Sequence, residues 1–177
     1  MRLSVLTSLY YLERPDFFQK SMESIWNDQL VKPDQIVLVK NGPVGNDLEE
    51  IIEAWAEILG PKLVIVIIED NIGLAHGLNQ GLKSCEGDYI ARMDTDDIST
   101  KARFKNQIAF LDKSPSIDIV GTYIAEINDN AELIKEEVKY PINHNDLLEF
   151  FSKRDPVAHP TVMFRRSFFQ KAGFYSE

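Results

Sequence analysis

The sequence predicts an α/β fold with a mainly parallel central sheet and helices on both faces. Four short apolar segments alternate with amphipathic segments over the first hundred residues, and polar residues end or follow each apolar segment. Strands that alternate with helices form parallel sheets, because each connection crosses the sheet and covers one of its faces. Ligands of such sheets bind beyond the carboxyl ends of the strands, so we expect the functional residues there.

The first half of the chain supplies four strands and three helices. Runs of apolar residues predict strands at 3–9, 36–39, 63–68 and 88–93. Between them, apolar residues recur at helical spacing over 17–26, 48–59 and 73–84. Pro15 suits the first turn of the first helix, and a Gly-Pro pair ends the second. In the third helix, Gly73, Gly77 and Gly81 form a bare stripe, on which we expect another backbone segment to pack closely.

The second half of the chain is less regular. Its pattern predicts a helix over 101–113, extended chain over 117–127 and a short helix over 147–151. A strand over 160–164 and a helix from about Arg166 follow. No internal repeat or low-complexity tract divides the sequence, so we expect one domain over residues 1–177.

Composition and charge narrow the classes of function. The 177 residues carry 19 Lys and Arg against 28 Asp and Glu, a net charge of −9. This balance argues against a nucleic-acid partner, because each phosphate contact needs a cation. The longest apolar run, 63–68, is far shorter than the ~20 residues of a membrane helix, and the N-terminus lacks the form of a secretory signal. The single cysteine, Cys85, fits a reducing compartment, so we expect a cytoplasmic protein.

Three carboxylates stand within four residues at the exit of the fourth predicted strand: Asp94, Asp96 and Asp97. Like charges this close repel, so keeping them ionised calls for a cation or strong hydrogen-bond donors. Mg²⁺ and Mn²⁺ prefer oxygen ligands and often bind one or two carboxylates together with substrate phosphates. The cluster therefore predicts a metal-bound diphosphate. The alternative is a solvated turn in which Asp97 or Ser99 caps the following helix.

Five motifs follow one another along the chain: SVLTSLYYLERPDFFQKSMESIWNDQ, IVLVKNGP, NIGLAHGLNQGL, GDYIARMDTDD, and HPTVMFRRS with KAGFY. In this order they resemble family 2 glycosyltransferases of the GT-A fold, above all bacterial enzymes of capsule, exopolysaccharide and lipopolysaccharide synthesis. The resemblance implies a three-layer fold with residues 1–98 as the nucleotide-binding half and 99–177 as part of the acceptor half. It also implies metal-assisted transfer of a sugar, with inversion, from a nucleoside-diphosphate donor, expected to be a UDP-sugar, to a glycan or lipid-linked acceptor.

The DTDD segment looks like the aspartate motif of that family. By this resemblance Asp96 is the direct ligand of Mn²⁺ or Mg²⁺, and Asp97 is a second ligand or supports the first. Asp94 or its neighbour Thr95 would contact the ribose of the nucleotide.

Residues after the first two predicted strands match nucleotide contacts of the family. Thr7 and Ser8 take positions that contact the nucleobase or ribose, and Glu13 in the same loop can reach the nucleotide. Asn41 stands where relatives commonly carry an aspartate that hydrogen-bonds the uracil ring. Because Asn presents a neutral carbonyl and a donor as well, this departure weakens uridine binding by about 1 kcal/mol or admits another base. Alternatively, Asn41 serves the backbone geometry of the turn before Gly42.

Five further residues match the family, each with a structural alternative. Asn71, Gly73 and Asn79 resemble residues that line the nucleotide-sugar pocket. The alternatives are a helix cap, a close packing contact and an exposed polar face, respectively. Arg92 either reaches a phosphate or forms a structural salt bridge. His159 resembles a histidine on the acceptor side, near the diphosphate, or is a structural histidine.

The resemblance also implies that a catalytic group lies outside this chain. Relatives carry a carboxylate general base, which removes the proton of the acceptor hydroxyl, in an ED pair a short way after the KAGFY-like segment. This chain ends at Glu177, so we expect the base beyond it and a fragment that binds the donor weakly and turns it over poorly. Peripheral contact with the inner face of the cytoplasmic membrane would belong to that further part.

Three other functions fit parts of the sequence. A noncatalytic nucleotide-sugar-binding module agrees with Asn41 and the missing base, whereas DTDD favours an enzyme. A nucleotidyltransferase shares the fold type but typically has a Gly-rich basic loop after the first strand, where this chain has TSLYYLERP. A phosphatase of the haloacid dehalogenase type usually needs Thr or Val four places after its first aspartate, where Ile98 stands.

Overall fold

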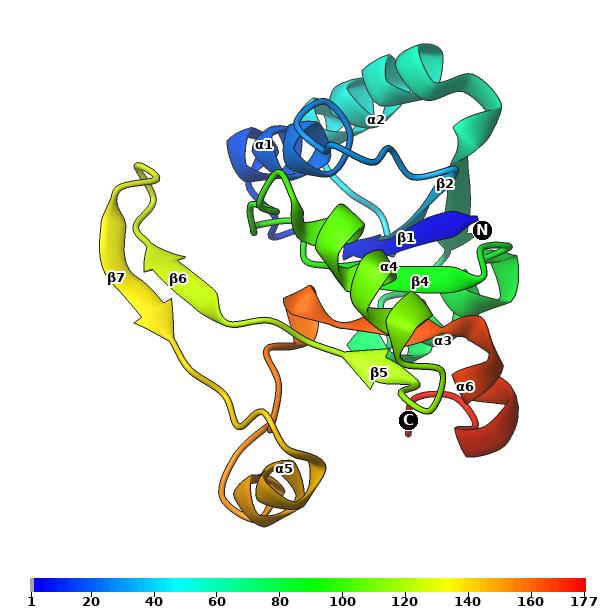
Figure 1. Cartoon of the computed structure of the whole chain (residues 1–177). Helices are drawn as coiled ribbons and strands as arrows, with labels where there is room; N and C mark the ends of the chain where they lie inside the picture. Colours follow the sequence, from blue (N-terminus) through cyan, green and yellow to red (C-terminus); the bar gives the residue numbers. More distant parts are fainter. Residues whose placement is uncertain (1) are drawn as a thin grey trace.

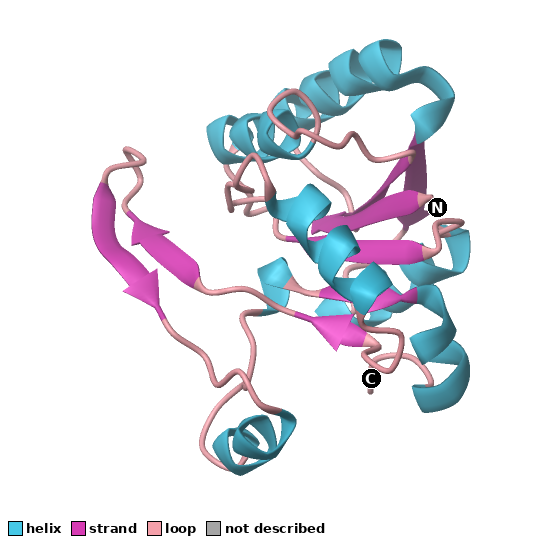
Figure 2. Cartoon of the chain, in the orientation of Figure 1, coloured by secondary structure: helices cyan, strands magenta, loops and turns pink. Residues whose placement is uncertain are grey.

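The computed structural model describes residues 2–177 and has the predicted α/β layout (Figure 1). A six-stranded sheet has the order β3-β2-β1-β4-β8-β5, and β6 and β7 form a separate two-stranded sheet (Figure 2). In the described part of the chain, no helix is long and apolar enough to cross a membrane.

The four predicted strands form the parallel part of the sheet. They are β1 (Leu3–Leu9), β2 (Gln35–Asn41), β3 (Leu63–Ile68) and β4 (Tyr89–Met93). β1 lies between β2 and β4, and Thr7 is opposite both Leu38 and Met93. All three pairings are parallel, so the carboxyl ends of the four strands lie at one edge. The chain order reverses at β1, and such a switch point opens a crevice for ligands at that edge.

Helices cover both faces of this sheet, as predicted. One core joins the sheet to α1 (Pro15–Ile25), α2 (Asn46–Leu59) and α4 (Arg103–Lys113), and includes Phe18, Trp55 and Phe104. A smaller core on the other face joins it to α3 (Leu74–Ser84) through Leu78 and Leu82. Neighbouring residues of β1 go to opposite cores, because side chains alternate between the faces of a strand.

The glycine stripe of α3 packs on side chains of the sheet rather than on another backbone segment, so that detail of the prediction is wrong. A Cβ at Gly81 would overlap the side chains of Leu6 and Val39, and one at Gly77 would lie 3.2 Å from Ser8 Oγ. Gly73 has open space around it but a φ of +117°, which permits the sharp turn into the helix.

The second half of the chain corrects the predicted extended segment 117–127. It divides into β5 (Ile119–Val120), in the main sheet, and β6 (Ile124–Ile127), which pairs with the unpredicted strand β7 (Leu133–Val138). β7 has no buried residue. Its sequence, LIKEEV, does not alternate between apolar and polar residues, which is the pattern that predicts a half-buried strand. The predicted short helix is α5 (His144–Phe151), which starts three residues earlier.

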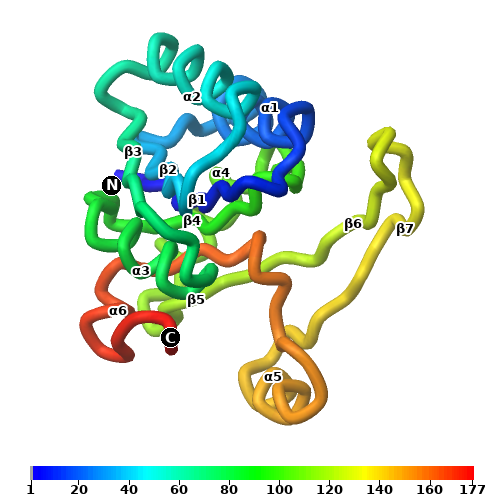
Figure 3. Tube along the Cα trace, turned by 180° about the vertical axis from the view of Figure 1, so that it is seen from behind, coloured from blue at the N-terminus to red at the C-terminus, as the bar shows by residue number. Residues whose placement is uncertain are grey.

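The chain then returns to the main sheet. Residues predicted to begin a strand at Pro160 form a 3-10 turn, η2 (His159–Thr161), and the strand is β8 (Met163–Arg165). β8 runs antiparallel to β4, and α6 (Arg166–Ala172) follows it. The β6–β7 hairpin and α5 project from the body as an arm, which is visible from the front and from behind (Figures 1 and 3). Residues 121–157 contribute no buried side chain, so the arm is held mainly by its two connections.

Candidate functional site

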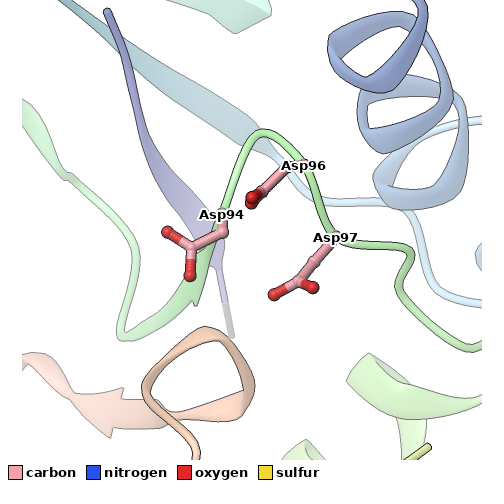
Figure 4. Close-up of side chains that lie close together, drawn as sticks. All are labelled: Asp94, Asp96 and Asp97. Carbon is pink, nitrogen blue, oxygen red and sulfur yellow. The ribbon is translucent and has the colours of Figure 1, made fainter. Parts of the chain in front are cut away.

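The acidic turn after β4 gathers the three predicted carboxylates. One oxygen from each of Asp94, Asp96 and Asp97 lies within 4.8 Å of the others. Figure 4 shows the three side chains along a single turn of the chain. Asp96 is exposed, and Asp94 is only partly buried. This spacing suits oxygen ligands around one divalent cation.

Burial and the neighbouring aspartates disfavour the charged form of Asp97. Burial, and then the charges of Asp94 and Asp96, raise the pKa of Asp97 to about 6. The charges of Arg92 and Arg103 act in the opposite direction but do not overcome these causes. A group whose charged form is disfavoured in this way gains most from a bound dication, because the cation restores the carboxylate.

Arg92 connects the acidic turn to the interior. Its side chain is 2% exposed and forms an ion pair with Asp94, while its Nε has no hydrogen-bond partner. Arg103, on α4, donates to the carbonyl oxygen of Arg92 at 2.7 Å. Burial and the neighbouring Arg92 lower the pKa of Arg103 to about 10. Sequence reasoning missed Arg103, because a basic residue one helix later gives no signal of its contact with β4.

Buried polar atoms without partners gather at the carboxyl edge of the sheet. Among the described residues such side-chain atoms belong to Thr7, Gln29, Asn41 and Arg92, and all of these except Gln29 lie towards the ends of β1, β2 and β4. A buried group without a hydrogen bond costs about 1–3 kcal/mol, so an unpaired set at one edge indicates a place for a polar ligand. Thr7 and Asn41 are 1% and 3% exposed.

Asn41, Asn71 and Gly73 lie in contact with one another in the structure. The side-chain amide of Asn41 donates to the carbonyl oxygen of Gly73 at 3.2 Å, and the oxygen of Asn41 has no partner. Asn71 accepts a hydrogen bond from the backbone N–H of Gly73 at 3.0 Å. Gly42 has a φ of +88° and lies against Asn71. The loop after β3 thus fixes the orientation of the Asn41 amide.

Glu13 and Thr95 link the loop after β1 to the acidic turn. Thr95 is buried and its hydroxyl donates to the carboxylate of Glu13. Ser21, on α1, donates to the carbonyl oxygen of Asp94 at 2.8 Å. The β1–α1 segment therefore supports the backbone of the turn, while Ser8 lies by Gly77 at the end of β1.

Asn79 and His159 meet at a residue that the sequence did not single out, Tyr175. Asn79 is buried and bonds the backbone of Tyr175, so its amide is engaged by the chain itself. His159 Nε2 lies 3.1 Å from the Tyr175 hydroxyl. Burial, followed by the charge of Arg92, lowers the pKa of His159 to about 4, so its imidazole is neutral at pH 7.

An open groove of about 320 Å³ lies beside the acidic turn. Asp96 and Asp97 form one side with Phe17 and Lys20 of α1, and the β6–β7 hairpin forms the other. Arg14 reaches Asp129 in the hairpin at 2.8 Å. Asp96 and Asp97 line the groove, whereas the ends of β1 and β2 do not. The groove therefore reaches the acidic turn from the side of the hairpin.

Comparison with known proteins identifies the family. The model described as "Glycosyl transferase family 2" matches residues 9–173. A curated relative, the amylovoran biosynthesis glycosyltransferase AmsE of Erwinia amylovora, is 38% identical over 173 residues, which are 97% of this chain and 63% of that protein. The UDP-Gal:alpha-D-GlcNAc-diphosphoundecaprenol beta-1,3-galactosyltransferase of Escherichia coli is 30% identical and covers 98% of this chain and 62% of its own length. The chain belongs to glycosyl transferase family 2.

Solved structures agree with the GT-A fold that the sequence predicted. S. aureus TarS 1–349 in complex with UDP-GlcNAc has a TM-score of 0.75 at 20% identity, over 100% of this chain and 49% of that one. The mannosyltransferase PcManGT of Pyrobaculum calidifontis, in complex with GDP-Man and Mn²⁺, has a TM-score of 0.71 at 18% identity, over 99% and 47%. The chain therefore spans less than two thirds of its first curated relatives and about half of these solved chains.

Proposed function

We propose that this chain is the donor-binding part of a glycosyltransferase that takes a sugar from a nucleoside-diphosphate donor to a glycan or lipid-linked acceptor. One observation carries the proposal: unpaired buried polar atoms and a three-carboxylate turn share the carboxyl edge of the sheet at its switch point. Solvent alone would not require such a set, whereas a nucleotide diphosphate offers donors, acceptors and negative charge. The nucleotide-sugar complexes of TarS and PcManGT support it at the level of fold.

In this proposal Asp96 and Asp97 hold Mn²⁺ or Mg²⁺. The exposed Asp96 reaches a shared cation most easily, and the raised pKa of Asp97 shows that burial and its acidic neighbours outweigh the charges of Arg92 and Arg103. A bound dication neutralises charge on the diphosphate leaving group. Asp94 forms an ion pair with Arg92. In this proposal the ion pair orients Asp94, which contacts the ribose or the metal.

The donor base in this proposal is uracil, and Asn41 reads it. Gly73 takes the Asn41 amide as a donor, so the buried oxygen of Asn41 presents only an acceptor to the site. That acceptor suits the N3–H of uracil but opposes the bare N3 of cytosine. In this proposal Asn41 accepts the hydrogen bond from the uracil ring that the family's aspartate accepts, but it carries no negative charge.

Arg92, Thr7 and Glu13 complete the donor site. The unpaired Nε of Arg92 is a buried cationic donor for a phosphate oxygen, and such charge-assisted bonds are among the stronger ones. Thr7 offers its free hydroxyl to the nucleoside, and Glu13, held by Thr95, stands by the ribose. The groove under the hairpin gives the acceptor a route to the turn.

Catalysis needs a base, and Glu177 is not free to act as one. Both carboxylate oxygens of Glu177 are engaged, one by Asn79 at 2.8 Å and one by His76 at 3.1 Å. These hydrogen bonds lower the pKa of Glu177 and make it a weak proton acceptor. We therefore do not assign the general base to Glu177, and we expect this chain to bind donor without efficient transfer.

The test is calorimetric titration of the chain with UDP, CDP, GDP and ADP, each with and without Mn²⁺. We expect UDP to bind tightest and only with the metal, and we expect Asp96→Asn to abolish the metal dependence. Asp112→Asn, on the far end of α4, is the matched control. Binding that is indifferent to Mn²⁺ and to Asp96 would reject the proposed function.

A noncatalytic nucleotide-sugar-binding module is the second candidate, and the engaged carboxylate of Glu177 is the observation that favours it. Both candidates predict the same binding of UDP and Mn²⁺. A protein extended to the length of the curated relatives separates them, because only the enzyme transfers sugar to an acceptor.

A further inference from the structure

The segment after α6 is attached to α3 mainly through the side chain of Asn79. Asn79 accepts a hydrogen bond from the Tyr175 N–H at 2.9 Å and donates to the Tyr175 carbonyl oxygen at 2.9 Å. Its amide also donates to Glu177 at 2.8 Å. The Asn79 amide thus forms hydrogen bonds with both the N–H and the carbonyl oxygen of Tyr175, which is 96 positions away in the sequence. A neighbouring β-strand would bond the same two groups.

His76 strengthens this attachment from one turn earlier in α3. Gln80 donates its amide to His76 Nε2 at 3.3 Å, so Nε2 is the acceptor and the proton is on Nδ1. Nδ1 then donates to Glu177 at 3.1 Å. Asn79 and His76, the latter supported by Gln80, therefore hold the Tyr175–Glu177 segment against α3.

The fixed Tyr175 in turn holds His159. The hydroxyl and Nε2 lie 3.1 Å apart, and the two rings meet edge to face at 5.5 Å between centroids. Burial raises the pKa of Tyr175 to about 12, so its hydroxyl stays protonated. The Arg92 N–H donates to the carbonyl oxygen of Val162 at 2.8 Å, and the Val162 N–H donates to the carbonyl oxygen of His159 at 3.2 Å, so η2 with His159 lies against the strand that carries Arg92.

We propose that Asn79 and Tyr175 are positioning residues of the donor site, acting through His159 on Arg92. Arg92 is buried with an unpaired Nε, so its direction depends on what packs against it. A neutral His159 held in one orientation adds no second positive charge next to Arg92, so Asp94 remains the ion-pair partner of Arg92. This inference rests on the proposed function, and it moves Asn79 from contact with the donor to support of the site.

Four forms of the full chain test this path by calorimetry with UDP at saturating Mn²⁺: unaltered, Tyr175→Phe, Asn79→Ala and the double variant. Tyr175→Phe removes one oxygen and keeps the ring, so it leaves the packing in place. We expect each single change to weaken UDP binding about 5- to 10-fold, the size of one lost hydrogen bond. The double variant should lose no more than the larger single change, because both act on His159. Tyr140→Phe, on the projecting arm, is the matched control.

A second readout distinguishes positioning from general loss of structure. The ring NMR signals of His159 should move in both single variants while those of His144 stay, at a temperature well below Tm. Unchanged UDP affinity in both variants, or fully additive losses, would overturn the inference alone. No UDP binding by the unaltered chain would overturn the proposed function, and the inference with it.

Discussion

Asn41 donates its side-chain amide to the carbonyl oxygen of Gly73, and this bond leaves the Asn41 oxygen buried and unpaired at the end of β2. The loop after β3 thus orients the Asn41 side chain so that its oxygen, and not its amide nitrogen, is left without a partner. A reversed amide would set its oxygen against the carbonyl oxygen of Gly73, so the orientation is strongly favoured. An asparagine held in this way imitates the acceptor of an aspartate.

Removing this acceptor should abolish base discrimination. We expect the unaltered chain to prefer UDP over CDP at least about tenfold, because a buried acceptor rejects a base that lacks the matching donor. Asn41→Ala should weaken UDP about tenfold and bring UDP and CDP to similar affinities, with Mn²⁺ binding unchanged. Competition titrations measure both effects, and the exposed Asn106→Ala is the control. Undiminished preference for UDP in Asn41→Ala would contradict this assignment.

The raised pKa of Asp97 gives metal binding a pH dependence. With a pKa of about 6, Asp97 is mostly protonated at pH 5 and mostly ionised at pH 7.5. Mn²⁺ affinity should therefore rise through this window, because the cation binds the carboxylate. Asp97→Asn should weaken Mn²⁺ and flatten the curve, as followed by the EPR signal of free Mn²⁺. A steep rise that persists in Asp97→Asn would assign the titration to another group.

His159 should make the stability of the fold depend on pH. Its folded pKa of about 4 lies below the 6.5 of the free side chain, so the unfolded chain binds the extra proton between these values. The contribution of His159 is complete above pH 6.5 and is lost as the pH falls towards 4. We expect the change from pH 7.5 to 5 to cost about 1 to 2 kcal/mol through this group.

Urea unfolding of His159→Gln measures this cost. The variant should lose less free energy of unfolding than the unaltered chain between pH 7.5 and 5, and His144→Gln, exposed on α5, should lose the same as the unaltered chain. Equal losses in all three proteins would show that His159 is as accessible to protons folded as unfolded.

The α3 glycines give a test of packing. Gly81→Ala improves helix propensity by about 1 kcal/mol but forces a methyl group into Leu6 and Val39. Overpacking costs about 1–3 kcal/mol, so we expect a net loss of stability of about 1 kcal/mol. Gly45→Ala, with open space around it, should change the free energy of unfolding by less than about 0.5 kcal/mol. Thermal denaturation compares the two, and a stabilised Gly81→Ala would contradict the close packing.

The parallel half of the fold could be predicted because its signals are local. Buried parallel strands such as 63–68 are continuous apolar runs, and Pro15 begins α1 as its fixed φ allows. Strand β7 of the arm could not be predicted, since it exposes nearly all of its side chains and carries no burial pattern. The turn at Pro160 depends on how β8 docks against β4, which no local pattern encodes.

The candidate site likewise has residues that could be predicted from the sequence and residues that could not. Residues at strand ends, such as Asp96 and Asn41, were predicted because parallel topology brings these ends to one edge. Arg103 and Tyr175 reach the site through tertiary contacts with Arg92 and His159 that no local sequence pattern signals, so their roles needed the structure. Asn79 was predicted to line the nucleotide-sugar pocket, whereas in the structure its amide bonds Tyr175 and Glu177.

The most direct test of the central claim is phosphorus ENDOR on the chain with Mn²⁺ and UDP. If the acidic turn holds the cation against the diphosphate, bound Mn²⁺ should show hyperfine coupling to phosphorus, and Asp96→Ala should remove both the bound Mn²⁺ and the coupling. Mn²⁺ that binds without phosphorus coupling, or a coupling that survives Asp96→Ala, would contradict the account.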